Sequence, residues 1–378
     1  MKGVVIAGYV RSPFTPAKKG ALARVRPDDL AAQVVRKLVE TSGVEPADLE
    51  DLILGCAFPE GEQGLNIARI VDFLAELPIS VAGATVNRFC GSSMQAIHMA
   101  AGAVTMGAGE AFVCGGVESM SRVPMTGFNV LPHPGLCESR PGAYISMGLT
   151  AENLARSHQI ARESQEAFAL DSHRKAAVAA ASGAFADEIA AIAQNGAAVE
   201  ADGCIRPDTS LEALAGLDPA FDSEGSVTAG TSAPLTDGAA AVLVCSEDYA
   251  EGHGLDVLAR IRSIAVAGCE PETMGLGPVG ATRKALDRAG LSLADIDVIE
   301  LNEAFAAQAL ACIQELDLPI EKLNLDGGAL ALGHPLGASG ARITGKAAML
   351  LKRNGGNYAL ATMCIGGGQG IATLLEAV

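Results

Sequence analysis

One cysteine of the sequence stands where a nucleophile could be activated. Cys90 lies in the run VNRFCGSSM at residues 86–94, where an apolar, strand-like segment meets a helix-like segment of small residues. A thiol in the first turn of a helix faces the positive end of the dipole and unpaired backbone N–H groups, which lower its pKa. The same groups could hold the oxygen of a tetrahedral intermediate. A buried, inert cysteine is the plainer interpretation, but the small residues after Cys90 would let a ligand approach the backbone.

A histidine in a glycine-rich loop is the second candidate. His334 lies in GGALALGHPLGASG at residues 327–340, a stretch that predicts a tight loop leading into a helix. So many glycines carry an entropic cost, which indicates that the shape of the loop matters. A neutral imidazole there could act as a general base toward a thiol or donate a hydrogen bond to a carbonyl. A purely structural histidine is the alternative.

A second cysteine follows the same logic. Cys364 lies in TMCIGGGQG at residues 362–370, where an apolar strand runs into glycines whose N–H groups could stabilise an anion. The alternative is a core cysteine at a strand end. The run fits neither the GxxxxGK[ST] nor the GxGxxG spacing, so it does not predict a nucleotide loop.

The segment NEAF at residues 302–305 comes directly after a predicted strand at residues 298–301. Its Asn302 would lie at the strand's carboxyl end, where α/β sheets usually place ligands. Asn302 could equally be the N-cap of a helix at residues 303–315. The other histidines and cysteines have no metal-ligand spacing, and no metal site is predicted.

The elements that must position these residues alternate between short apolar strands and helices. We predict an N-terminal α/β half at residues 1–118, an inserted loop domain for substrate at residues 119–231, and a C-terminal α/β half at residues 232–378. Residues 38–53 and 286–299 share a pattern in which a helix ends at glycine and an acidic turn leads into a strand. A duplicated α/β unit explains this repetition.

Composition excludes several classes of protein. The formal charge of −17 argues against nucleic acid as a partner, because phosphates would be repelled over most of the surface. No apolar run reaches the ~18 residues that a membrane-spanning helix needs. The nine cysteines contain no CxxC pair, and the chain enters a strand-like run almost at once without a leader. We therefore expect reduced thiols and a cytoplasmic protein.

Taken together, these segments resemble the thiolase family. The matching runs are NRFCGSS at residues 87–93, NEAF at residues 302–305, the loop around His334, and CIGGG at residues 364–368, and the resemblance extends over essentially the whole chain. It implies the thiolase fold, a duplicated five-layer α/β/α/β/α core with an inserted loop domain. It also implies acyl transfer beside a coenzyme A thioester, with ping-pong kinetics.

The resemblance also implies roles for individual residues. Cys90 resembles the nucleophile that becomes acylated. His334 resembles the residue that activates it and that polarises the thioester oxygen together with Asn302, acting through a water. Cys364 resembles the acid/base at the acetyl-CoA carbon, and the N–H groups of Cys90 and Gly366 resemble a second oxyanion hole. The chemistry requires two such thiols, because acyl transfer needs a nucleophile and the departing enolate needs a proton donor.

Within the family, the chain looks more like a bacterial degradative 3-ketoacyl-CoA thiolase of fatty-acid β-oxidation. Short-chain members typically carry a His-Met pair where this sequence has Ser146 and Met147, and the loss of the imidazole leaves room for an acyl chain. Ala233 replaces a serine that usually faces the pantetheine arm of CoA, so Ser232 is the neighbouring candidate. Arg206 is expected near the CoA nucleotide. The alternative is a short-chain acetyl-CoA C-acetyltransferase that makes acetoacetyl-CoA.

Four other interpretations fit the sequence less well. A condensing enzyme of fatty-acid or polyketide synthesis would pair its cysteine with two histidines, or with a histidine and an asparagine, and would lack Cys364. A sterol-carrier-type thiolase usually reads HDCF in place of NEAF. A non-catalytic scaffold would not need Cys90, His334 and Cys364 together, and a Cys/His hydrolase leaves Cys364 unexplained.

The resemblance sets expectations for ligands and partners as well. CoA is a substrate, and neither a metal nor a redox cofactor is expected. A homodimer or homotetramer is expected, as is a role as subunit of a multifunctional β-oxidation complex. Neither nucleic-acid binding nor membrane insertion is expected.

Overall fold

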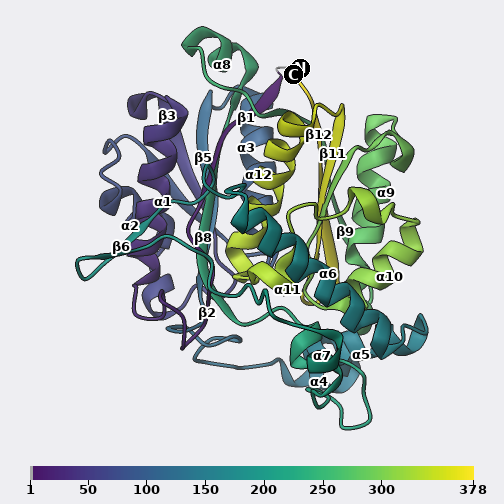
Figure 1. Ribbon diagram of the computed structural model, residues 1–378. Coiled ribbons are helices and arrows are strands. Elements are labelled where there is room, and N and C mark those ends of the chain that lie inside the picture. Colours follow the sequence, from purple (N-terminus) through teal and green to yellow (C-terminus); the bar gives the residue numbers. More distant parts are fainter. Residues whose placement is uncertain (1–2) are drawn as a thin grey trace.

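The computed structural model describes residues 3–378, whose helices and strands form five layers (Figure 1). Two groups of strands flank a pair of central helices, and other helices cover the outer faces of both groups. The predicted α/β/α/β/α layering is confirmed. Within the described part of the chain, none of the helices has the length and apolarity needed to cross a membrane.

The first group of strands is built mainly from the N-terminal part of the chain. It contains β1 (Val4–Arg11), β2 (Thr15–Pro16), β3 (Leu49–Gly55), β4 (Ala82–Val86), β5 (Ala111–Ser119) and β8 (Thr236–Ser246). The main order is β4-β3-β5-β8-β1, and β2 pairs with β8. β3 runs parallel to both neighbours, whereas β8 runs antiparallel to β5 and β1.

The second group repeats this order. It contains β9 (Ala259–Gly268), β10 (Val298–Leu301), β11 (Tyr358–Ile365) and β12 (Gln369–Glu376), ordered β10-β11-β12-β9. Leu323 forms an isolated parallel bridge to Ile299, at the place that β4 takes beside β3. The predicted duplication is therefore confirmed. β1 and β9 pair at only two residue positions, which joins the groups into one path.

The helices also repeat. α1 (Pro27–Ser42) and α2 (Ile67–Leu74) cover the first group, and α9 (Gly277–Ala289) and α10 (Ala306–Leu316) cover the second. α3 (Ser92–Met106) and α12 (Leu336–Asn354) pack against each other between the groups. Small residues allow this close approach, because a Cβ at Gly340 would lie 2.5 Å from the Met94 nitrogen. The short α8 (Glu247–His253) lies between β8 and β9, and the short α11 (Ala329–Leu332) lies directly before α12.

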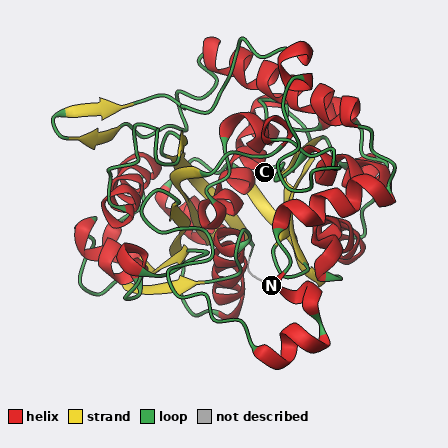
Figure 2. Cartoon of the chain, turned by 90° about the horizontal axis from the view of Figure 1, so that it is seen from below, coloured by secondary structure: helices red, strands yellow, loops and turns green. Residues whose placement is uncertain are grey.

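The inserted region lies between β5 and β8. It contains α4 (Pro134–Ser139), α5 (Met147–Ser157), α6 (Arg162–Ala181), β6 (Ile192–Gln194), β7 (Ala197–Val199) and α7 (Leu211–Ala215). Figure 1 shows α4, α5 and α7 at the end of the molecule opposite the C-terminus, and in Figure 2 the β6–β7 hairpin projects from the body.

The strand pairing moves one predicted boundary. The C-terminal half was expected to begin at residue 232, but β8 pairs with β5 along its whole length and therefore belongs to the first group. An alternation of apolar residues predicts a strand without saying which sheet it joins. The second repeat begins after α8, close to β9.

Candidate active site

The N-terminal ends of α3 and α12 meet in the central layer. Cys90 stands two residues before α3, and His334 stands two residues before α12. The two ends are joined by a hydrogen bond in which the Ala341 N–H donates to Ser93 Oγ at 2.8 Å. The duplication thus supplies two equivalent positions, and the sequence fills one with a thiol and the other with an imidazole.

The turn that carries Cys90 is held in an uncommon backbone conformation. Phe89 has a φ of +41°, which is rare for a bulky side chain and is found mainly where the surroundings enforce it. The Asn87 Oδ1 accepts from the Phe89 N–H at 2.8 Å. Ser92 Oγ accepts from the Arg88 N–H at 2.9 Å and donates to the Phe89 carbonyl at 2.5 Å. Side chains on both sides of Phe89 therefore stabilise this turn.

Burial dominates the protonation of Cys90. It raises the pKa of the Cys90 thiol to about 12, while the N–H groups of Gly366 and of Cys90 itself act to lower it. The lowered pKa expected from the helix end is therefore not found. Gly91 is the N-cap of α3, so Cys90 lies just outside the first turn of the helix. At neutral pH the nucleophile rests as a thiol, which needs a base.

Cys364 and Gly366 come from the end of β11 and the turn after it. Cys364 is 1% exposed and packs in an apolar cluster with Ala151, Val227 and Phe305. Burial raises the pKa of the Cys364 thiol well above its ordinary value, and the nearby Cys90 raises it further. The two predicted thiols lie near each other, because their chain neighbours Gly91 and Ile365 are in contact: a Cβ at Gly91 would lie 2.6 Å from Ile365 Cδ1. The Gly366 N–H acts on the Cys90 thiol.

The His334 imidazole is neutral and oriented. Burial lowers the pKa of His334 to about 3, and Arg342 lowers it further. Its Nδ1 lies 2.6 Å from Ser339 Oγ, and its Nε2 lies 3.5 Å from Asn302 Nδ2. If Nδ1 carries the hydrogen and donates to Ser339, Nε2 is left with the lone pair that a base requires.

Asn302 faces this imidazole rather than capping a helix. α10 begins at Ala306 with Phe305 as its N-cap, so the expected helix start at residue 303 and the Asn302 cap are not found. Asn302 is fully buried, and its Oδ1 has no hydrogen-bond partner among the described residues. A buried amide oxygen without a partner is suited to a bound water or substrate group.

Two buried carboxylates shape the loops of the site: Glu303, which the NEAF segment places beside Asn302 at the carboxyl end of a strand, and Glu118, to which the sequence gave no role. Glu303 accepts from Ser172 Oγ, Asn324 Nδ2 and the Leu330 N–H, which fixes the loop before His334. Glu118 is 1% exposed and accepts from the backbone N–H groups of residues 57, 58 and 337. The sequence offers one sign of the role of Glu118, because this acidic residue lies at the end of an otherwise apolar strand. A charge buried there needs hydrogen-bond donors around it.

Of the three residues expected to contact CoA, Met147 and Ser232 lie beside segments of the site, and Arg206 lies farther from the two thiols. Met147 Sδ would be 3.4 Å from a Cβ at Gly366. Ser232 pairs with Phe305 in an isolated bridge, and its hydroxyl donates to the Thr228 carbonyl at 2.7 Å. Arg206 is exposed and has no contact with the two thiols among the contacts of the described residues.

Arg206 is nevertheless linked to the His334 loop through its chain neighbours. The Cys204 Sγ would lie 3.2 Å from a Cβ at Gly333, and the Arg206 N–H donates to His173 Nδ1 at 3.1 Å. Burial raises the pKa of Cys204 to about 12 and lowers the pKa of His173 to about 4, and the Arg206 guanidinium acts to lower both. Arg206 thus adds an exposed positive charge beside the His334 side of the site.

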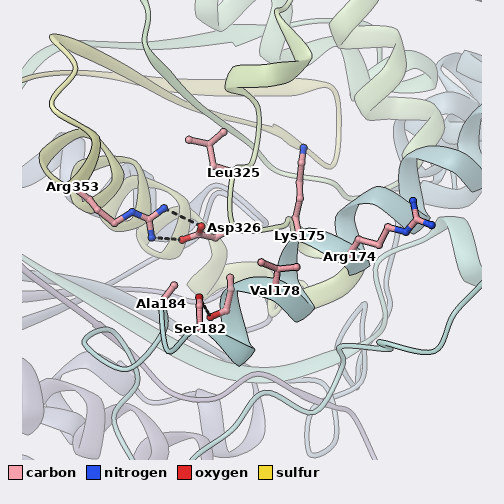
Figure 3. A pocket seen from close by; sticks show the side chains of 9 residues that line it. Arg174, Lys175, Val178, Ser182, Ala184, Leu325, Asp326 and Arg353 are labelled. Carbon is pink, nitrogen blue, oxygen red and sulfur yellow. Dashed lines mark hydrogen bonds and ion pairs between the residues drawn. The ribbon is translucent and has the colours of Figure 1, made fainter.

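A separate hollow of about 430 Å³ lies between α6 and the C-terminal end of α12 (Figure 3). Its lining contains no predicted site residue. Arg353 is paired with Asp326, and the Arg174 and Lys175 side chains point away from each other (Figure 3). Within residues 3–378 no three His, Cys, Asp or Glu side chains are grouped so as to hold a metal ion.

Comparisons with known proteins cover the whole chain. The family description "Thiolase, N-terminal domain" matches residues 4–248, and "Thiolase, C-terminal domain" matches residues 255–377. Proteins named 3-ketoacyl-CoA thiolase from Shewanella frigidimarina and Erwinia tasmaniensis are each 52% identical over 388 aligned positions, with 100% of both chains covered.

Two solved structures have the same fold over the full length. Human mitochondrial 3-ketoacyl-CoA thiolase in complex with CoA has a TM-score of 0.93 at 39% identity, covering 100% of this chain and 98% of that one. The acetyl-CoA acetyltransferase of Bacillus anthracis has a TM-score of 0.92 at 42% identity, covering 100% and 99%.

Proposed function

The chain belongs to the thiolase family, and from this premise we propose that it is a 3-ketoacyl-CoA thiolase that cleaves its substrate through an acyl-Cys90 intermediate. Thiolases are acyltransferases. The observation that carries the proposal is the meeting of two thiols, Cys90 and Cys364, with the Gly366 N–H directed at the first of them. One thiol can form a covalent acyl intermediate while the other exchanges a proton with carbon.

The first half-reaction breaks the carbon–carbon bond. His334 Nε2 takes the proton of Cys90, and the sulfur bonds to the C3 carbonyl carbon, whose oxygen is held by the N–H groups of Cys90 and Gly366. The C2–C3 bond then breaks, and its electron pair forms the enolate of acetyl-CoA. Protonated His334, and Asn302 through a water, hold the enolate oxygen, while Cys364 gives its proton to C2.

The second half-reaction transfers the acyl group to CoA. The Cys364 thiolate takes the proton of the CoA thiol, and the CoA sulfur attacks the carbonyl carbon of acyl-Cys90. The Cys90 and Gly366 N–H groups again hold the oxygen of the tetrahedral intermediate. The bond to Cys90 breaks, and His334 returns the proton to the departing thiolate. The products are acetyl-CoA and an acyl-CoA shortened by two carbons.

We assign CoA binding to the inserted region, residues 119–231, and to the loop after it. The exposed charge of Arg206 suits a CoA phosphate, and Ser232 and Met147 lie close enough to the Phe305 and Gly366 segments to contact the pantetheine arm and the acyl group. CoA is then a substrate, and the proposed chemistry uses neither a metal nor a resident cofactor.

The experiment that tests the proposed function is CoA-dependent thiolysis of 3-ketoacyl-CoA substrates from four carbons upward. Cleavage of long chains supports the degradative class. Activity confined to acetoacetyl-CoA would instead assign the enzyme to the short-chain acetyltransferases, an alternative supported by the 42% identity to the Bacillus anthracis structure. No cleavage at any length would contradict both assignments.

Replacing Ser339 by alanine is expected to lower kcat about 10- to 100-fold with little change in KM, because the imidazole loses the partner that orients it. Steady-state thiolysis kinetics measure this change. Ser182→Ala, which removes a hydroxyl bonded to the Ala179 carbonyl on α6, serves as the control. A Ser339→Ala enzyme with unchanged kcat would show that the hydrogen bond to His334 is not needed.

The rate of Cys90 alkylation by iodoacetamide in the free enzyme is expected to rise about tenfold per pH unit between about pH 6 and about pH 9. The pKa of Cys90 is raised to about 12, so the thiolate fraction keeps growing as the pH rises through this window. His334 does not titrate there, because its pKa is about 3. Site-resolved mass spectrometry follows the reaction, and a plateau below about pH 8 would reveal a thiolate–imidazolium pair instead.

The proposed cellular setting is cytoplasmic fatty-acid β-oxidation by a homodimer or homotetramer. β4 lies at one edge of the strands, and its residues are exposed or half-buried, so this edge is open to a second copy. Association with a multifunctional β-oxidation subunit is part of the same proposal. Size-exclusion chromatography with light scattering tests the homo-oligomer.

A further inference from the structure

Two turns from different halves of the molecule contact each other at the nucleophile. The nucleophile turn, residues 87–91, precedes α3, and the glycine turn, residues 365–369, joins β11 to β12. A Cβ at Gly91 would lie 2.6 Å from Ile365 Cδ1, and one at Gly366 would lie 3.8 Å from Phe89 Cδ2. The turns are in close contact at Gly91, where no side chain would fit, and at Gly366 a Cβ would make an ordinary contact. A shift of either turn therefore changes the position of the Gly366 N–H relative to Cys90.

One side chain crosses between the turns with hydrogen bonds at both ends. The Arg88 guanidinium donates through Nε to Gln95 Oε1 at 2.9 Å, on α3, and through one terminal nitrogen to Gln369 Oε1 at 2.8 Å. Arg88 lies two residues before Cys90, and Gln369 lies three residues after Gly366. The planar guanidinium fixes the direction of both bonds, which a lysine could not do.

We propose that the Arg88–Gln369 hydrogen bond is a positioning contact that sets the Gly366 N–H against the Cys90 sulfur. The inference deepens the proposed function and rests on it. Arg88 would thereby hold in place the Gly366 N–H, which stabilises the oxygen of the tetrahedral intermediate in both half-reactions. Arg88 and Gln369 touch neither reacting thiol in this assignment and act through the two turns.

The strained conformation of the nucleophile turn explains why such a contact is needed. Phe89 has a φ of +41°, and the hydrogen bonds from Asn87 and Ser92 that stabilise it lie within the first half. They fix the shape of the turn but not its position against β12. The Arg88–Gln369 contact supplies that position, and a second polar contact between α3 and β12, from His98 Nε2 to Thr373 Oγ1 at 2.9 Å, continues the same interface.

A general loss of stability should not follow from breaking this contact. It is one partly buried hydrogen bond, whereas the halves are also held by the buried packing of α3 on α12. A single such bond contributes modestly to folding, but a displacement of about 1 Å at a reacting group can reduce a rate about 100-fold.

The test is a double-mutant cycle with Arg88→Met, Gln369→Met and the combination, each measured for kcat, KM and melting temperature. Each single variant should lower kcat about 10- to 100-fold with KM within about threefold, and the double variant should lose no more than the singles. Gln369→Glu should retain activity, because a carboxylate also accepts from the guanidinium. Arg288→Met on α9, which breaks an exposed hydrogen bond to the Ile264 carbonyl on β9, is the matched control.

A second measurement separates this inference from the proposed function. The alkylation rate of Cys90 by iodoacetamide should fall several-fold in Arg88→Met and Gln369→Met at constant pH, because the Gly366 N–H no longer stabilises the thiolate. This readout applies even if the wild type fails to cleave 3-ketoacyl-CoA. Unchanged kcat and alkylation in the single variants, or losses that multiply in the double variant, would overturn the proposal.

Discussion

Replacing Cys90 by alanine is expected to abolish thiolysis, with kcat falling by roughly 10⁴- to 10⁶-fold, the scale of loss when a covalent nucleophile is removed. No other described thiol can take its place, because the Gly366 N–H is directed at Cys90 and Cys364 is buried in an apolar cluster. The variant should also form no acyl-enzyme when it is incubated with acetyl-CoA, which mass spectrometry of the intact protein measures.

A matched control is available on the surface. Cys137 lies in α4 and is an exposed free thiol, so Cys137→Ala should keep full activity and full acylation. Circular dichroism should show that Cys90→Ala is folded, since the half-buried thiol fills little of the core. Residual turnover within about tenfold of the wild type would contradict the covalent route.

Replacing Cys364 by alanine is expected to slow carbon–carbon cleavage much more than acylation of Cys90. Carbon–carbon cleavage should fall about 10²- to 10⁴-fold, because C2 of the departing acetyl-CoA loses its proton donor. Acylation of Cys90 by acetyl-CoA should be slowed less, because Cys364 there protonates only the departing CoA sulfur, and a thiolate can leave without a proton whereas the C2 carbanion needs one. Thiolysis kinetics measure the first effect, and the mass of the trapped acyl-enzyme measures the second.

The control for Cys364 must itself be buried. Cys114 in β5 is fully buried, and its Sγ lies 3.6 Å from the Ala96 carbonyl, so Cys114→Ala removes a core thiol without touching the site. It should lower the melting temperature about as much as Cys364→Ala while leaving kcat unchanged. If Cys364→Ala cleaved 3-ketoacyl-CoA normally, or if it lost acylation as well, the assigned division between the thiols would be wrong.

Much of the candidate site could be predicted because its residues are carried by local sequence patterns. Glycines and small residues around Cys90, His334 and Cys364 indicate tight turns at the ends of strands and helices, and such turns are decided within a few residues. The repeated pattern at residues 38–53 and 286–299 likewise indicated the duplication. The family, the fold and the layering predicted from these patterns are confirmed.

Other features depend on residues that are distant in the chain, and a single sequence does not pair them. Arg88 reaches Gln369 across 281 positions, and Glu118 reaches Gly337 across 219. The membership of β8 in the first group follows from hydrogen bonds to β5 and β1 rather than from its composition. The hydrogen bond between His334 and Ser339 spans only five residues, but it depends on the shape of the loop.

The sequence singles out the candidate groups, which are two thiols, one imidazole, one carboxamide and the glycines that expose their backbone. Their protonation and contacts follow from the folded structure. The helix end beside Cys90 predicted a lowered pKa, yet burial raises the pKa to about 12, because the loss of water outweighs a few N–H groups. Burial depends on everything packed around a residue, and that is settled when the two halves of the chain come together.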